Sequence, residues 1–264
     1  MNSKKINNKL KIFVTYRPGS GGQFMCLLLI SLQKPVTLTN KYSGHAELHL
    51  ISVGQQIQGF QFSEEFLKYT EADMDLDVGS AWLRKNFNFY DTNQDYYTIH
   101  TLLKNIDVVT KAWPEAKIIK ITTEESDVDQ MWYNWITKSM TFHQDWWRLK
   151  ERVLQVQKLH NRLHWVDVDN MDNYQHDIKL CCYIMKFSKT QPSRVQHEHN
   201  LERCYSIPFQ DMFNKNLINH LDPLIEFLSI NTDYEKKMGA IKLINEYADA
   251  QKTVPWKILL EDYQ

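Results

Sequence analysis

The sequence predicts an α/β protein in which a parallel sheet carries helices on both faces. Three observations lead to this fold class. Short β-branched and aromatic runs alternate with helix-like segments, a glycine-rich turn joins the first run to an apolar helix, and one later run, AKIIKIT, is rich in isoleucine. Strands that alternate with helices are typical of a parallel sheet covered on both faces.

The first half of the chain supplies the predicted strands. KLKIFVTY ends before Pro18, YYTIHT follows a polar stretch, and AKIIKIT follows Pro114. These runs predict strands at residues 9–16, 96–101 and 116–122. Helices are expected at residues 21–32, in a short capped segment that begins at residue 63, at residues 102–113 and at residues 128–139. The acidic run at residues 73–77 predicts a solvated turn, and residues 81–90 predict a helix or an irregular segment.

The second half of the chain is mainly helical by its pattern. Helices are expected at residues 143–163, 177–187, 216–229 and 233–249. HWVDV at residues 164–168 predicts a strand, and the polar residues 188–203 predict a loop. With no repeat and no low-complexity linker, we expect one domain over residues 1–264, with a helical cap from roughly residue 140 to residue 200.

Composition argues against several classes of protein. The 31 basic and 32 acidic residues leave a net charge of −1, which does not favour a nucleic-acid partner. The longest apolar run, near residues 25–32, is about a third of a bilayer span, so we expect no membrane segment and no signal peptide. The four cysteines (Cys26, Cys181, Cys182 and Cys204) form no Cys-x-x-Cys pair. We therefore expect reduced thiols and a cytoplasmic location.

The glycine-rich turn RPGSGG, residues 17–22, predicts an anion site. Backbone amides in such a turn can converge on one anion, and the helix behind them adds about half a positive charge. The ATP/GTP pattern is not met, because Gln23 and Phe24 stand where Lys and Ser/Thr are required. Each glycine before the helix costs about 1 kcal/mol relative to alanine. We therefore infer that another group must approach the backbone closely at these positions. A glycine turn without a ligand is the alternative.

Four segments, in the right order, resemble the sulfotransferase family of P-loop proteins. They are PGSGGQF at residues 18–24, YTIHT at residues 97–101, WPEAKIIKI at residues 113–121, and IPFQDMF at residues 207–213 followed by LIEFLSI. Small members of this type are common in tailed phages. The resemblance implies a three-layer P-loop-type sheet, a nucleotide sulfonate donor, 3′-phosphoadenylyl sulfate (PAPS), and no requirement for Mg²⁺.

The resemblance also implies roles for individual residues. His100 would be the catalytic base, and Arg17 would supply a cation to the sulfonate. The implied cofactor-binding residues are Arg17, Pro18, Gly19, Ser20, Gly21, Gly22, Gln23, Phe24 and Thr123. Three positions depart from the family pattern: Gly19 replaces the loop lysine, Thr123 the arginine of the 3′-phosphate motif, and Met131 its serine. The implied PAPS contacts are therefore at the 5′ end of the nucleotide rather than at its 3′-phosphate.

These features favour transfer of a sulfonate from PAPS to a hydroxyl or amine of an unidentified small-molecule or carbohydrate acceptor. Two alternatives stay open: a divergent P-loop kinase acting on a nucleoside, nucleotide or DNA base, and a non-catalytic binding or virion-associated protein that keeps the fold. His100 could equally be a hydrogen-bonded core histidine. No metal site is expected, because the His160–His164 pair lacks the glutamate of a His-Glu-x-x-His motif and the HEH at residues 197–199 lies in a polar loop.

Overall fold

The structure is a computed structural model. The described residues are 9–16, 20–36, 40–42, 45–47, 57–59, 68–71, 73–87, 95–101, 105–127, 130–131, 146–170, 180, 184 and 204–250. They fall into two compact units. The first comprises Met1–Tyr16, Gly21–Thr122 and Gln196–Gln251, and the second comprises Arg17–Ser20, Thr123–Val195 and Lys252–Gln264. The expectation of one domain with a helical cap stays a prediction.

A five-stranded parallel sheet forms the centre of the first unit. Its order is β4 (Ile57–Gly59), β5 (Tyr96–Thr101), β1 (Leu10–Thr15), β6 (Lys117–Thr122) and β7 (Cys204–Pro208). All four neighbouring pairs are parallel. The predicted α/β class is confirmed, as are the strands at β1, β5 and β6. The pattern did not indicate β7, whose five residues include only one β-branched residue and end at a proline.

The strand order reverses at β1. From β1 the chain moves outward to β4, returns to β5 beside β1, and then crosses to β6 on the other side of β1. In open parallel sheets, ligands bind at the carboxyl ends of the strands where the order reverses. The carboxyl end of β1 is therefore the position at which this topology favours a site. A separate two-stranded sheet pairs β2 (Asn40–Tyr42) with β3 (His45–Glu47).

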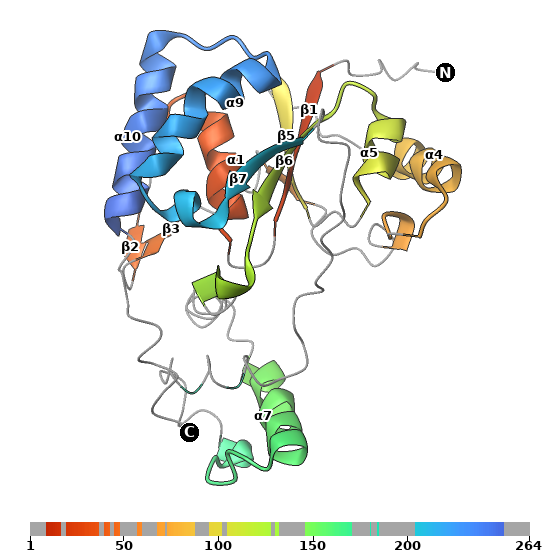
Figure 1. Ribbon diagram of the computed structural model, residues 1–264, viewed down its shortest axis with the longest axis vertical. Helices are drawn as coiled ribbons and strands as arrows, with labels where there is room; N and C mark the ends of the chain where they lie inside the picture. Colours follow the sequence, from red (N-terminus) through yellow and green to blue (C-terminus); the bar gives the residue numbers. More distant parts are fainter. Residues whose placement is uncertain are drawn as a thin grey trace. The chain divides into compact units, whose positions relative to one another are not determined.

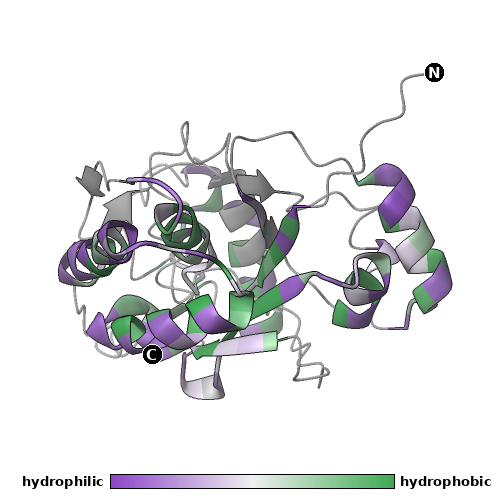
Figure 2. Cartoon of the chain, turned by 90° about the horizontal axis from the view of Figure 1, so that it is seen from above, coloured by the Kyte–Doolittle hydropathy of each residue, from purple (hydrophilic) through white to green (hydrophobic). Residues whose placement is uncertain are grey.

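One face of the sheet is covered by α1 (Gly22–Ser31) and α10 (Tyr234–Ala250), as Figure 1 shows. Helix α1 is buried at every residue except Gln23, which agrees with its apolar sequence on all sides. The Tyr96 hydroxyl of β5 donates a hydrogen bond to the Leu29 carbonyl of α1. Figure 2 shows that the helices around the sheet carry both hydrophilic (purple) and hydrophobic (green) stretches.

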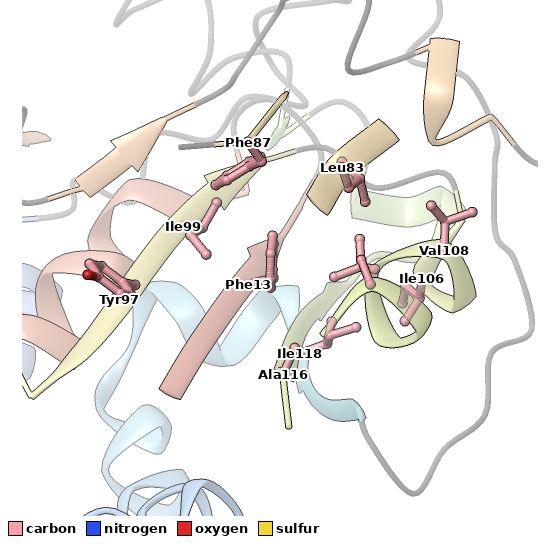
Figure 3. Packing of buried hydrophobic residues seen from close by; sticks show 11 residues of the cluster. Phe13, Leu83, Phe87, Tyr97, Ile99, Ile106, Val108, Ala116 and Ile118 are labelled. Atoms are coloured by element: carbon pink, nitrogen blue, oxygen red, sulfur yellow. The ribbon is translucent and has the colours of Figure 1, made fainter. Parts of the chain in front are cut away.

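The opposite face is covered by α4 (Leu76–Asn86) and α5 (Ile106–Ala112). Each helix begins at a side-chain cap: Asp75 accepts from the amides of Asp77 and Val78, and Asn105 accepts from those of Asp107 and Val108. The apolar cluster in Figure 3 lies between these helices and the sheet. Its buried members are Phe13, Leu83, Phe87, Tyr97, Ile99, Ile106, Val108, Val109, Ala112, Ala116 and Ile118. The acidic segment predicted as a solvated turn thus contains the N-cap and first residues of α4.

The C-terminal part of the first unit follows β7. It consists of the 3₁₀ helices η4 (Phe209–Phe213) and η5 (Lys215–His220), then α9 (Leu221–Leu228) and α10. The single helix predicted at residues 216–229 is therefore divided between η5 and α9. Helix α10 confirms the prediction at residues 233–249. Among the described residues, no helix combines the length and low charge that a bilayer crossing needs.

The second unit contains η1 (Glu125–Asp127) and α7 (Trp146–His160), which confirms the predicted long helix. Its buried apolar cluster comprises Val153, Val156, Leu163, Val166, Leu180 and Ile184. The strand predicted at residues 164–168 is wrong. Asn161 and Leu163 have left-handed backbones, and the Val166 amide donates to the Leu163 carbonyl, so the segment turns where a strand would extend. Most residues of the helices predicted at 128–139 and 177–187 lie outside the described residues.

Candidate anion site at the carboxyl end of β1

The chain leaves the sheet at Thr15 and returns as α1 at Gly22. The glycine turn therefore lies between a strand and a helix, as the sequence predicted, and the structure makes that strand the central one. Arg17, Pro18 and Gly19 lie outside the described residues, so the proposed cation and the first half of the turn stay predictions. The second half of the turn, Ser20 to Gly22, is described, as are Gln23 and Phe24 that follow it.

Gly21 is the N-cap of α1 and has a left-handed backbone, with φ of 85°. Glycine adopts this conformation without steric cost. A Cβ at position 21 would stand 3.2 Å from Cε of Met212 and 3.4 Å from Cζ of Phe213. Side chains of η4 therefore back the turn at this residue.

Gly22, the first residue of α1, is covered by the ring of Tyr16. A Cβ at position 22 would lie 2.4 Å from Cγ of Tyr16, which is shorter than any ordinary contact. Both glycines are thus required by packing within the chain. The inference that they are present for close approach of a ligand is not needed to explain them.

The first turn of α1 provides the amides that an anion would need. The Met25 amide donates to the Gly21 carbonyl at 3.0 Å, which begins the helical ladder. The amides of Gly22, Gln23 and Phe24 precede that bond, at the positions where helix amides have no intrahelical carbonyl to reach. No acidic residue lies in the first turn. The positive end of the helix dipole is therefore not offset by a carboxylate of that turn.

Burial keeps the groups around the turn neutral. Desolvation raises the pKa of the Tyr16 phenol far above its ordinary value, and burial does the same for the Cys26 thiol. Neither group carries a negative charge near neutral pH. The Tyr16 ring beside Gly22 therefore adds no repulsion toward an anion.

Phe24 was predicted to contact the cofactor, but its side chain belongs to the core. It is 1% exposed, and its ring stacks on that of Tyr247 at 3.6 Å between centroids. Only its backbone amide can face a ligand. Gln23 is half-buried, and it is the one residue of α1 whose side chain is not buried.

His100 lies on β5, next to β1. In the parallel register, His100 pairs with Val14 of β1 and with Gly59 of β4. Its backbone is thus two strand residues from Tyr16, near the carboxyl end of the sheet. Its side chain lies outside what the structure describes, so the role of the imidazole stays a prediction.

Ser20 and Thr123 belong to the second unit and are both buried, at 0% and 6% exposure. Thr123 directly follows the last residue of β6, which pairs with β1. Met131, at the position of the family's serine, is 1% exposed. Among the described residues, no three His, Cys, Asp or Glu side chains are grouped as a metal site would require.

Sequence reasoning missed the side chains that back the turn. Tyr16 was assigned only to the first strand, and Met212 and Phe213 only to a resembling segment. The contacts of Met212 and Phe213 with Gly21 join residues almost 200 positions apart, whereas Tyr16 contacts Gly22 from within the same segment. No local pattern indicates such contacts.

Comparisons with known proteins find similarity among solved structures. No family model matches the chain, and no curated protein matches it. The chain is similar to a solved structure, a sulfotransferase domain from the curacin biosynthetic pathway, with 13% identity and a TM-score of 0.31 over 96% of this chain and 95% of that domain. An overlap this low carries no argument, and the fold class stated above depends on the strand topology.

Proposed function

We propose that the protein is a sulfotransferase-like transferase that moves a sulfonate group from PAPS to a hydroxyl or amine acceptor. One observation carries the proposal. The glycine N-cap of α1 lies at the carboxyl end of the central strand, where the strand order reverses. This is the place where parallel α/β sheets bind ligands and where helix amides favour anions.

The proposed chemistry is an in-line transfer. The acceptor oxygen or nitrogen forms a bond to sulfur while the bond between sulfur and the phosphosulfate bridging oxygen breaks, leaving 3′,5′-ADP. His100 takes the acceptor proton. The turn amides, Ser20 and Arg17 stabilise the charge on the transferring group, and Thr123 lies in the 3′-phosphate segment. These roles come from the motif resemblance, and a relation to the small proteins of tailed phages is part of the same proposal.

A cytoplasmic location is also proposed. Cys26 and Cys204 are free cysteines, which is compatible with a reducing compartment.

Thermal-shift titration tests the donor. PAPS and 3′,5′-ADP should each stabilise the protein, because a ligand at 100 times its dissociation constant adds about 2.7 kcal/mol to the folded state. Mg-ATP should not, since the turn lacks the lysine and hydroxyl that hold ATP and Mg²⁺. Stabilisation by Mg-ATP alone would instead support the kinase alternative.

A pair of histidine variants tests the catalytic base. His100→Ala should abolish sulfonate transfer from PAPS while 3′,5′-ADP still raises the melting temperature. His164→Ala is the control, because His164 is exposed in the second unit and contacts the Asn161 side chain. Unchanged transfer in His100→Ala would remove this residue from the mechanism.

The packing of the glycines favours a second candidate function, a non-catalytic binding protein. Tyr16, Met212 and Phe213 explain both glycines without a ligand, and Thr123 replaces the family's arginine. Under this alternative, none of the three nucleotides raises the melting temperature.

A further inference from the structure

Three polar side chains form a continuous hydrogen-bonded network beside β7. The Asp211 Oδ2 atom lies 3.0 Å from Nε2 of His220, and Nδ1 of His220 lies 3.1 Å from the Tyr205 hydroxyl. In addition, the side-chain Nδ2 of Asn216 donates to Oδ1 of Asp211 at 3.2 Å. The side chains of His220 and Asp211 are only 21% and 22% exposed.

The network joins three consecutive elements. Tyr205 lies on β7 and Asp211 lies on η4. His220 ends η5 and occupies the N-cap position of α9. The rings of Tyr205 and His220 meet edge to face, with 6.0 Å between centroids. The network therefore fixes η4 relative to the edge strand of the sheet.

The same short helix backs the anion turn. Met212 and Phe213 directly follow Asp211, and they are the side chains that a Cβ on Gly21 would meet. Met212 is 0% exposed, and the Phe213 ring lies 5.0 Å from that of Phe209 and 6.2 Å from that of Tyr247. One part of η4 thus holds the polar network while the next two residues pack against the N-cap of α1.

We propose that Asp211, His220 and Tyr205 are positioning residues for the anion turn. They hold η4 so that Met212 and Phe213 keep Gly21 in its left-handed conformation. As far as a ligand is concerned, this inference rests on the proposed function.

Two physical properties make such a support necessary. A five-residue 3₁₀ helix has poor hydrogen-bond geometry and needs contacts from outside to keep its place. Glycine has more backbone freedom than any other residue, so Gly21 depends on its surroundings for a single conformation. A turn that is already ordered loses less conformational entropy when it binds.

The position of the network favours a supporting role for Tyr205 over a direct role in transfer. A hydroxyl, an imidazole and a carboxylate in this order are also found around catalytic nucleophiles. Tyr205, however, pairs with Ile119 of β6 and lies three residues before the end of β7. Desolvation also raises the pKa of its phenol.

Hydrogen exchange on the ligand-free protein tests the support directly. In Asp211→Ala and His220→Ala, the Met25 amide, which donates to the Gly21 carbonyl, should exchange about tenfold faster, the factor that corresponds to losing one hydrogen bond to a charged group. The amides of β5 and α5 should keep their wild-type rates. His220→Gln, which retains one donor and one acceptor, should restore slow exchange.

The control variant is Asp222→Ala on α9, which removes an exposed ion pair with Lys237. It should leave exchange of the Met25 amide unchanged. Wild-type exchange of this amide in His220→Ala would overturn the inference. Equal acceleration at β5 and α5 would also overturn it, because the network would then stabilise the whole fold and not the turn.

Binding of 3′,5′-ADP separates this inference from the proposed function. If wild-type protein binds the nucleotide, its dissociation constant should rise about tenfold in His220→Ala and recover in His220→Gln. An unchanged dissociation constant in His220→Ala would overturn the positioning role. If wild-type protein does not bind, the proposed function fails, and the exchange experiment still decides whether the network orders the turn.

Discussion

The two faces of the sheet are built differently. The face of α4 and α5 has a buried apolar cluster. Each of these two helices begins at an Asp or Asn whose side chain caps it. On the face of α1, the helix has a glycine N-cap and is buried almost throughout. Polar atoms also enter this second interface: Tyr96 donates to α1, and the Thr98 hydroxyl is buried without a hydrogen-bond partner among the described residues.

The face of α4 and α5 mainly stabilises the fold, whereas the face of α1 begins at the glycine turn. The face of α4 and α5 has helix N-caps that the local sequence provides and a buried apolar cluster, and both features stabilise the fold. Helix α1 begins at a glycine N-cap without a side-chain hydrogen bond, which costs only about a few tenths of a kcal/mol relative to a side-chain cap.

The largest expected effect is on the apolar face. Phe13→Ala should lower the free energy of unfolding by about 3–5 kcal/mol, the usual cost of emptying a buried aromatic site. Phe13 is 0% exposed and stacks on Trp113 at 5.7 Å between centroids. Equilibrium urea denaturation measures the loss, and a loss below about 1 kcal/mol would contradict the importance assigned to this cluster.

Glycine substitutions compare the two faces directly. Gly22→Ala should cost about 1–3 kcal/mol, since the new Cβ would lie 2.4 Å from the Tyr16 ring. Gly79→Ala on α4 should cost at least as much, because its Cβ would meet the backbone oxygen of Tyr69 at 2.7 Å, and backbone yields less readily than a ring.

Gly239→Ala on α10 is the matched control for both. No described atom lies within 4 Å of its Cβ position, so alanine should stabilise the helix by about 0.5–1 kcal/mol. Thermal denaturation of the three variants ranks them. A neutral Gly22→Ala would show that Tyr16 moves aside freely and does not fix the turn.

The smallest expected effect concerns the buried hydroxyl on the α1 face. Thr98→Val keeps the shape of the side chain and removes an unpaired polar atom, so the protein should gain about 1 kcal/mol. Thr110→Val on α5 is the control, because its hydroxyl donates to the Asp107 carbonyl at 3.1 Å. It should gain nothing. Destabilisation in Thr98→Val would mean that the hydroxyl has a partner.

Local sequence signals predicted the elements that carry them. The β-branched runs of β1, β5 and β6, the apolar helix α1 and the long periodic helices α7 and α10 were all expected at these places. Strand β7 was missed because its five residues contain only one β-branched residue and end at a proline, so they do not stand out from a loop. The strand expected at residues 164–168 failed because Asn161 and Leu163 adopt left-handed backbones, which an apolar pattern does not register.

The sequence by itself determined the α/β class and the place of the glycine turn between a strand and a buried helix, because hydrophobic periodicity and glycine are local signals. Only the tertiary structure decided which strand is central and what the two glycines contact. Strand order and the packing of Met212 and Phe213 on the turn depend on burial between segments far apart in the chain, and no window of sequence contains that information.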